Sequence, residues 1–230
     1  MIESCLFADR CNKIDCDKDF CVKKFKLDYL FDQALLSEKH KKELVLRVDA
    51  DKRDLEAFKY LKSIQNSVEK FVENGDNLYI HSLISGNGKT SFAIKILKEY
   101  FYRIWSKSDL RCRGLYIHVP KYLISLKDNI SEKSDYVQHI KKNALDADLV
   151  IFDEVGTKSL TSFEFENILT IINARLDYGK ANIYTSNLTN EELLDNLGSR
   201  LYSRIVNNSN DVVFVGQDKR GLFQWYNYKC

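Results

Sequence analysis

Glycine, lysine and threonine residues are spaced for phosphate binding in the segment Gly86-Asn-Gly-Lys-Thr90. The two glycines let the backbone turn tightly and point amide hydrogens at phosphate oxygens. Lys89 would then bridge the β- and γ-phosphates of a nucleotide, and the Thr90 hydroxyl would hold Mg²⁺. A helix expected to begin near Lys89 adds its positive end to the same place. The segment therefore predicts a phosphate-binding loop, because an ordinary strand–turn–helix joint needs none of these residue types.

The loop residues expected to surround the phosphates are contiguous: Ser85, Gly86, Asn87, Gly88, Lys89, Thr90 and Ser91. One position departs from the full motif, which has glycine where this chain has Leu83. A leucine there implies a less strained exit from the preceding strand, or a somewhat altered loop. The departure would weaken nucleotide binding, but it leaves the residues that touch phosphate unchanged.

Two carboxylates follow an apolar run at residues 149–152, which predicts a buried strand with an acidic end. Asp153 would coordinate Mg²⁺ through water, opposite Thr90. Glu154 would polarise the water that attacks the γ-phosphate. P-loop kinases need no such base, so the pair favours an ATPase that hydrolyses its nucleotide.

Two later segments supply further polar groups. Asn187 follows the apolar run 181–185 and would orient the lytic water together with Glu154. Arg200 and Arg204 lie one helical turn apart, hence on one face of a helix. A cation delivered from a neighbouring subunit to the γ-phosphate would couple hydrolysis to assembly. Taken alone, the two arginines would equally suit an exposed helix surface.

The elements that must position these residues follow from hydrophobic periodicity. Short apolar or β-branched runs predict five strands, at residues 78–83, 115–119, 149–152, 181–185 and 212–215. Amphipathic patterns between them predict helices at residues 90–105, 162–176 and 191–206. Strands that alternate with helices form a mostly parallel sheet covered on both faces, so the fold class is α/β.

Three regions are distinguished along the chain: a Cys-rich module at 1–30, a helical linker or partner region at 31–75, and the ATPase domain at 76–230. Between residues 55 and 72 apolar side chains recur at three- and four-residue steps, which predicts a helix. Asp51 is its candidate N-cap, and Gly75 is its candidate C-cap.

Four cysteines gather near the beginning of the sequence: Cys5, Cys11, Cys16 and Cys21. Four thiolates could hold a tetrahedral Zn²⁺, whose binding would supply folding energy that a 30-residue module lacks. The tight pair with two intervening residues is absent from this spacing. An iron–sulfur cluster would use the same ligands, and four unrelated thiols are the third alternative.

Composition excludes some functional classes. The formal net charge of +2 is too small for a protein that coats nucleic acid, so a DNA contact must come from a local patch. Residues 120–144 combine lysines with Tyr122 and Tyr136, which suits single-stranded DNA or, equally, a solvated helix pair. The sequence has neither a secretion signal nor an apolar run of about 20 residues, so we expect a cytoplasmic protein without membrane contact.

The order of motifs resembles the AAA+ helicase loaders, the DnaC/DnaI-like group, and the related IstB-like transposition ATPases. The resemblance covers about residues 76–221, on the segments Gly-Asn-Gly-Lys-Thr, Leu-Val-Ile-Phe-Asp-Glu-Val-Gly, Thr-Ser-Asn-Leu, Gly-Ser-Arg-Leu-Tyr-Ser-Arg-Ile and Gly-Gln-Asp-Lys-Arg. It implies that Arg204 is an arginine finger supported by Arg200, and that Asn187 is a sensor residue. Arg220 is a weak candidate for a second sensor.

The resemblance also implies a function: an ATP- and Mg²⁺-dependent loader that binds a DnaB-type replicative helicase and single-stranded DNA and self-associates through its ATP site. About fifteen residues follow Val215, too few for the helical lid of other AAA+ proteins. The portion before the ATPase core is shorter than in the bacterial loaders that the chain resembles, which suggests a compact, phage-type variant. The alternatives are a transposition helper with a transposase and duplex DNA as partners, and a non-hydrolytic adaptor. A nucleotide kinase is disfavoured because no basic lid segment is evident.

Overall fold

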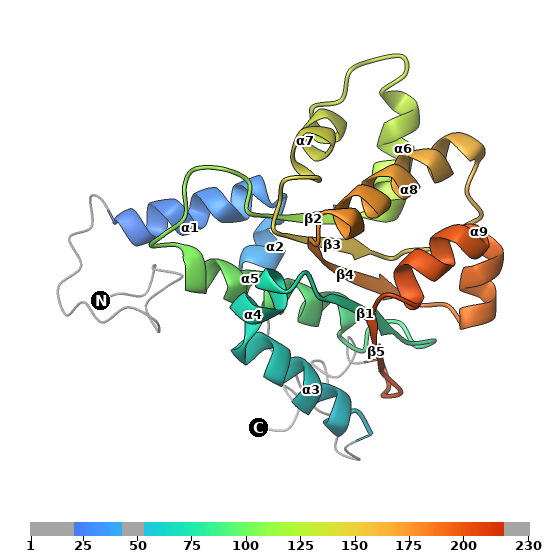
Figure 1. Cartoon of the computed structure of the whole chain (residues 1–230), viewed down its shortest axis with the longest axis horizontal. Helices are drawn as coiled ribbons and strands as arrows, with labels where there is room; N and C mark the ends of the chain where they lie inside the picture. The colour runs from blue at the N-terminus through green and yellow to red at the C-terminus, as the bar shows by residue number, and fades with distance from the viewer. Residues whose placement is uncertain (1–20, 43–52, 219–230) are drawn as a thin grey trace, which may run out of the picture.

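The structure, a computed structural model, describes residues 21–42 and 53–218 of the chain (Figure 1). At its centre is a five-stranded sheet with strand order β2-β3-β4-β1-β5, in which every neighbouring pair is parallel. The strands are β1 (Asn77–His81), β2 (Gly114–His118), β3 (Leu149–Asp153), β4 (Ala181–Ser186) and β5 (Asn210–Val213). The predicted sheet is confirmed, and each strand begins at its predicted start or up to two residues earlier.

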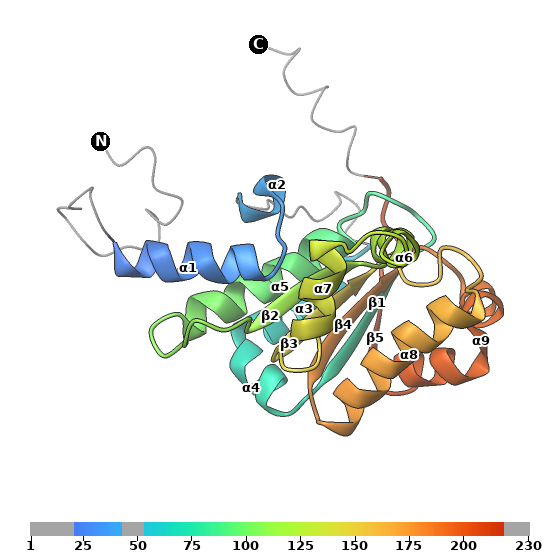
Figure 2. The ribbon, with the colours of Figure 1, turned by 90° about the horizontal axis from the view of Figure 1, so that it is seen from above.

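Helices cover both faces of the sheet (Figures 1 and 2). The helices of the described residues are α1 (Val22–Gln33), α2 (Glu38–Lys41), α3 (Leu55–Asn66), α4 (Val68–Glu73), α5 (Lys89–Ile104), α6 (Val119–Asp128), α7 (Asp135–Asn143), α8 (Ser162–Asp177) and α9 (Asn190–Val206). Residues of α1, α3, α4 and α5 share one hydrophobic core, and residues of α6 to α9 share the other. Within β1, Leu78 and Ile80 belong to the first core and Tyr79 to the second, because successive side chains of a strand point to opposite faces.

The single helix predicted between residues 55 and 72 is divided into two helices, α3 and α4. The helix that begins at Leu55 ends at Asn66, and Ser67 separates it from α4 with φ −116° and ψ 32°. Gly75 ends the helical region as predicted, with a left-handed φ of +68°. A Cβ atom on Gly75 would lie 2.2 Å from the carbonyl oxygen of Gly179, so this turn has room only for glycine.

The N-cap of α3 differs from the expected residue. Asp51, the predicted cap, lies outside the described residues, and Asp54 directly precedes α3. The buried carboxylate of Asp54 accepts hydrogen bonds from the backbone N–H groups of Val215 and Gly216, at 2.8 and 3.0 Å. Asp54 therefore ties the beginning of α3 to the chain that leaves β5.

Helix α1 packs directly into the core around the sheet. Leu27, Leu30 and Phe31 are buried in the core that contains α5, and the boundary expected at residue 30 falls inside this helix. The carbonyl oxygen of Ala34 accepts a hydrogen bond from the N–H of Tyr116 at 2.9 Å, along the outer side of β2. The segment after α1 thus covers one edge of the sheet.

A buried arginine joins several elements at the amino ends of the strands. The side chain of Arg175 in α8 is fully buried and donates to Asn182 Oδ1 and to the carbonyl oxygens of Ala144, Ala147 and Ala181, at 2.6 to 2.7 Å. Burial lowers its pKa to about 10, so the guanidinium remains charged at neutral pH. All four acceptors are neutral, and together they fix α8 to β3 and β4.

Candidate active site

The loop between β1 and α5 turns through two glycines with positive φ, +76° at Gly86 and +110° at Gly88. Gly88 is the N-cap of the 16-residue helix α5, and no side chain caps the first turn of that helix. Free amide groups at the positive end of a helix bind anions. The loop therefore has the backbone conformation that phosphate binding requires.

Lys89 is folded into this loop and is almost fully buried. Its ammonium group donates to the carbonyl oxygen of Ile84 at 3.0 Å and to Asn87 Oδ1 at 3.3 Å. The Asn87 side chain also bonds Ser82 Oγ at 2.6 Å, so it braces the loop from within, while Ser85 is exposed. A buried ammonium group held by neutral oxygens, beside a helix N-terminus that no side chain caps, fits the phosphates of ATP.

Leu83 occupies the position where the motif has glycine, and its backbone is not strained there. Its φ is not positive, and 67% of its side chain surface is exposed. The loop therefore leaves β1 in a conformation that an ordinary residue adopts, as the less strained exit predicted.

Three hydroxyl groups converge on Asp153, the last residue of β3. Thr90 Oγ1 and Thr185 Oγ1 each donate to Oδ1 at 2.7 Å, and Tyr116 donates to Oδ2 at 2.8 Å. Burial, reinforced by Asp153, raises the pKa of Tyr116 well above its usual value, so the phenol remains a donor. The structure thus brings together the two residues predicted to hold Mg²⁺, Thr90 and Asp153, and oxygen ligands of this kind suit that ion.

Glu154 follows with a positive φ of +60°, which non-glycine residues rarely adopt. Its N–H donates to Thr185 Oγ1 at 3.0 Å, and its Oε2 lies 3.2 Å from His118 Nε2. His118 Nδ1 accepts from the backbone N–H of Lys121, so the proton of the neutral ring is on Nε2 and points to Glu154. The carboxylate is therefore held at the carboxyl edge of the sheet by backbone conformation and by one side chain.

Asn187 and the two arginines occupy different surroundings. Asn187 directly follows Ser186, the last residue of β4, which pairs with His81 of β1. The carbonyl oxygen of Ser186 also accepts a hydrogen bond from the N–H of Ser82 at 3.2 Å. Asn187 therefore lies beside the start of the phosphate-binding loop. Arg200 and Arg204 are exposed on α9, and neither guanidinium has a hydrogen-bond or ion-pair partner within residues 21–42 and 53–218.

Comparison with known proteins extends this picture. No protein-family model matches the sequence, and no curated protein matches it. The DnaC helicase loader matches with a TM-score of 0.58 and 20% identity, over 74% of this chain and 93% of that one. A Streptococcus pyogenes serotype M3 protein described as a primosome component gives a TM-score of 0.60 and 16% identity, over 84% and 98% of the two chains. The initiator DnaA bound to AMPPCP and single-stranded DNA gives a TM-score of 0.54 and 18% identity, over 69% of this chain and 45% of that one.

The chain has the AAA+ fold of the helicase loaders. The resemblance inferred from the motifs is thereby confirmed at the level of the fold. These solved structures are 16 to 20% identical to this chain, so the role of each residue depends on the geometry of the site.

Three residues of this site were not expected from the sequence: Tyr116, His118 and Thr185. The register between β2 and β3 places the first two beside Asp153. His118 pairs with Asp153, and Tyr116 lies two residues earlier on the same face of β2. The only local signal was that a histidine ends an apolar run next to the acidic strand. Recognising it would have required knowing that β2 and β3 are neighbours.

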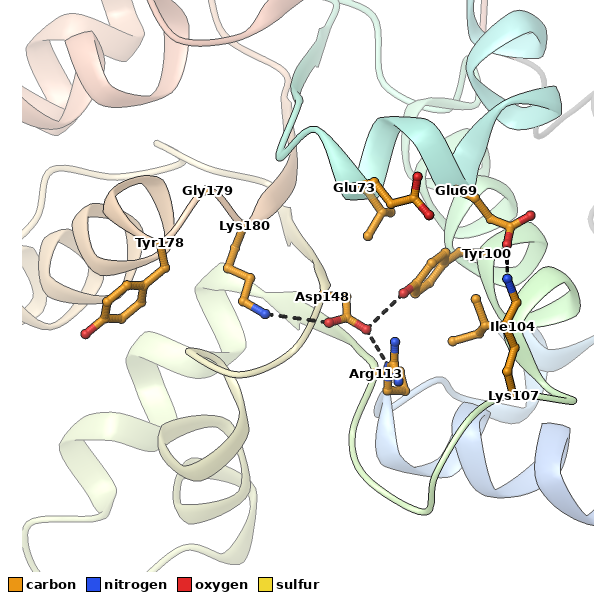
Figure 3. A pocket seen from close by; sticks show the side chains of 11 residues that line it. Glu69, Glu73, Tyr100, Ile104, Lys107, Arg113, Asp148, Tyr178, Gly179 and Lys180 are labelled. Carbon is orange, nitrogen blue, oxygen red and sulfur yellow. Dashed lines mark hydrogen bonds and ion pairs between the residues drawn. The ribbon is translucent and has the colours of Figure 1, made fainter.

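A cavity of about 390 Å³ lies at the opposite edge of the sheet (Figure 3). Asp148, just before β3, accepts from Tyr100 at 2.9 Å and from Arg113, and its other oxygen is 3.6 Å from Lys180 Nζ. These charged groups pair with one another, and the residues that line the cavity include none of the loop 82–90 and neither Asp153 nor Glu154. The cavity is therefore distinct from the nucleotide site.

The basic segment at residues 120–144 contributes to α6 and α7, and its two tyrosines differ in burial. Tyr122 is fully buried, so it cannot supply the base stacking that the single-stranded DNA alternative would use. Its position in the apolar stripe of α6 places it in the core. The Lys121 ammonium lies 4.5 Å from the ring centroid of the partly buried Tyr136.

Glu164 connects this segment to α8. It is fully buried, forms the capping box of α8 with Thr161, and accepts from Lys158 Nζ at 2.6 Å, with Lys127 Nζ at 3.3 Å. Burial by itself would raise its pKa, but the hydrogen bonds from Lys158, Thr161 and Lys127 outweigh that effect and lower the pKa to about 2. Lys127 is thus engaged within the protein.

We expect Glu164→Gln to lower the free energy of unfolding at pH 7 by about 2 kcal/mol, because glutamine keeps the capping box but loses the charge. The folded-state pKa lies below the ordinary value of 4.5. The carboxylate therefore stabilises the fold above about pH 4.5, and this contribution is lost as the pH falls toward 2. Urea unfolding at pH 7 and at about pH 3.5 should show the two proteins converging. A difference that does not change with pH would mean that the charge of Glu164 is irrelevant.

Several predicted residues lie outside the described residues. Cys5, Cys11 and Cys16 are among them, whereas Cys21 is described and directly precedes α1. Within the described parts of the chain, no group of three or more His, Cys, Asp or Glu side chains could hold a metal ion. The zinc site stays a prediction.

Arg220 and the expected absence of a lid also fall outside the described residues, in 219–230. Among the helices of residues 21–42 and 53–218, none combines the length and apolar character that crossing a membrane requires.

Proposed function

We propose that this chain is an ATP-hydrolysing helicase loader, which assembles with a DnaB-type replicative helicase and single-stranded DNA during DNA replication. The observation that carries the proposal is the joining of Thr90, Asp153 and Glu154 beside an uncapped α5 N-terminus, in a fold that the DnaC helicase loader shares. The fold alone would suit many partners, and the site supplies the case for hydrolysis.

The residues divide the chemistry among them. The loop amides and Lys89 bind the β- and γ-phosphates, and Thr90 and Asp153 hold Mg²⁺. The bound ion neutralises charge on the phosphate oxygens. Glu154 takes a proton from the attacking water, while His118 holds one oxygen of its carboxylate and Asn187 orients the water. In this assignment ATP hydrolysis needs no residue beyond those at the carboxyl edge of the sheet, apart from a cation at the γ-phosphate.

That cation comes from a second subunit. Arg200 and Arg204 are exposed, and they have no partner among the described residues of their own chain. A guanidinium group supplied in trans stabilises transition-state charge at the γ-phosphate. We propose that Arg204 is this finger and that Arg200 supports it, so that ATP turnover accompanies self-association.

The partners are proposed from the neighbours' own descriptions. One neighbour is a helicase loader, and another is an initiator solved with AMPPCP and single-stranded DNA. In this chain the exposed lysines of the α6–α7 segment, Lys133, Lys141 and Lys142, offer phosphate contacts. They supply the local positive charge that the small net charge of the whole chain does not.

The test uses Glu154→Gln, which should trap the ATP-bound state, as bait in a lysate of the native host, with partners identified by mass spectrometry. Lys89→Ala, which should not bind ATP, is the matched control. Recovery of the replicative helicase by the first bait and not by the second supports the loader. Recovery of a transposase would favour the transposition helper, and equal recovery by both baits would favour an adaptor that needs no nucleotide.

A further inference from the structure

Asp153, the carboxylate proposed to hold Mg²⁺, accepts hydrogen bonds at both of its oxygens. Only the hydrogen bond from Thr90 must change when the ion binds. Thr90 donates to Asp153 Oδ1 and, as a proposed ligand, must turn its hydroxyl oxygen to Mg²⁺. Tyr116 donates to the other oxygen, Oδ2, at 2.8 Å from the neighbouring strand β2. Tyr116 can therefore fix the orientation of Asp153 both before and after the ion binds.

Tyr116 is in turn held by the segment before the ATPase core. Its backbone N–H donates to the carbonyl oxygen of Ala34 at 2.9 Å. The imidazole of His40, in α2, packs edge-on against its ring, with centroids 5.2 Å apart and an interplanar angle of 75°. His40 Nδ1 is buried and has no hydrogen-bond partner among the described residues, so His40 acts on Tyr116 through ring packing.

Helix α2 is short and is held to the core mainly by polar contacts. Its four residues include no buried side chain. Apart from His40, two contacts join it to the core. The Lys41 ammonium pairs with the Asp32 carboxylate of α1. Lys98 of the P-loop helix α5 donates to the carbonyl oxygens of Lys41 and Lys42 at 2.8 and 2.7 Å. Helix α2 therefore touches both elements that supply the magnesium site, α5 through Lys98 and Asp153 through Tyr116.

We propose that Tyr116 and His40 are positioning residues for Asp153, and that this pair couples α2 to the magnesium end of the nucleotide site. The proposal rests on the proposed ATPase function for its magnesium ion. The contacts that define the pair involve only residues of this chain, so the coupling can also be measured in the free protein.

The first experiment measures binding of a non-hydrolysable ATP analogue as a function of Mg²⁺ concentration. Tyr116→Phe keeps the ring and removes the hydroxyl, and we expect it to need about tenfold more Mg²⁺ for half-maximal binding. His40→Ala should need about threefold more, and His40→Phe, which restores a ring edge, should return to the wild-type value. Binding without Mg²⁺ should be unchanged in all three, which a general loss of folding would not produce.

Tyr122→Phe is the matched control. Tyr122 is another buried tyrosine, but it lies on α6 and its hydroxyl has no hydrogen-bond partner in the described residues. Its loss should leave the Mg²⁺ dependence unchanged. An unchanged Mg²⁺ requirement in Tyr116→Phe, or an equal change in Tyr122→Phe, would overturn the positioning role.

The second experiment is hydrogen exchange in the nucleotide-free protein. His40→Ala should raise amide exchange in β2 several-fold, because Tyr116 loses its ring contact with α2, and His40→Phe should restore protection. Unchanged exchange in β2 would overturn the coupling to α2. If the wild type shows no Mg²⁺-dependent analogue binding, the proposed ATPase function fails, and exchange alone then decides whether α2 is coupled to Tyr116.

Discussion

Replacing Glu154 by glutamine should lower ATP turnover about a thousandfold while leaving ATP binding nearly unchanged. Glutamine has the same shape and can still accept the hydrogen bond from His118 Nε2. Its amide cannot take a proton from the attacking water at neutral pH, so the loss falls on the chemical step. The phosphate contacts come from the loop and Lys89, which the substitution does not touch.

Phosphate release at saturating ATP, together with binding of a fluorescent ATP analogue, separates these two effects. Glu166→Gln is the matched control, since Glu166 is an exposed glutamate on the neighbouring helix α8. It should behave as the wild type in both assays. Turnover by Glu154→Gln within a fewfold of the wild type would remove Glu154 from its role as the base.

Arg204→Ala should bind nucleotide normally as an isolated chain and lose about a thousandfold of the turnover that appears on assembly. The reason is that Arg204 is exposed and has no partner in the described part of its own chain, so its charge is available to a neighbouring site. Turnover of the wild type should rise with protein concentration, and turnover of Arg204→Ala should not. Arg103→Ala, an exposed position on α5, controls for the loss of an arginine.

Mixing two inactive variants makes this test sharper. Arg204→Ala has an intact base and lacks the finger, whereas Glu154→Gln has the finger and lacks the base. If the finger acts in trans, the mixture should recover turnover that neither variant shows alone. A mixture as inactive as its components, or Arg204→Ala activity equal to the wild type at every concentration, would contradict a shared site.

The sheet and the phosphate-binding loop could be predicted because their signals are local. Apolar runs locate the strands, and Gly88 and Lys89 stand next to each other in the sequence. The hydroxyl groups around Asp153 could not be predicted in this way. Tyr116 and Thr185 reach it only because β2 and β4 flank β3, and strand order depends on packing across the whole sheet.

Helix α9 shows how a regular pattern can conceal a break. Its buried residues Leu193, Leu197, Leu201 and Ile205 recur every four positions, as in one continuous helix. Gly198 nevertheless has φ 73° and ψ 159°, which no helix contains, and both arginines follow it. The glycine itself was the available signal, since glycine inside a helical pattern costs about 1 kcal/mol unless it has a structural reason.

The surroundings of Arg175 have a consequence for genetics. Three of its four acceptors are backbone carbonyl oxygens, which remain whatever side chain occupies those positions. A salt bridge can be rescued by exchanging the charges of its two partners, but here no partner carries a charge that could be exchanged. Second-site suppressors of a substitution at Arg175 should therefore be global stabilisers scattered over the protein, rather than changes that cluster around the lost guanidinium.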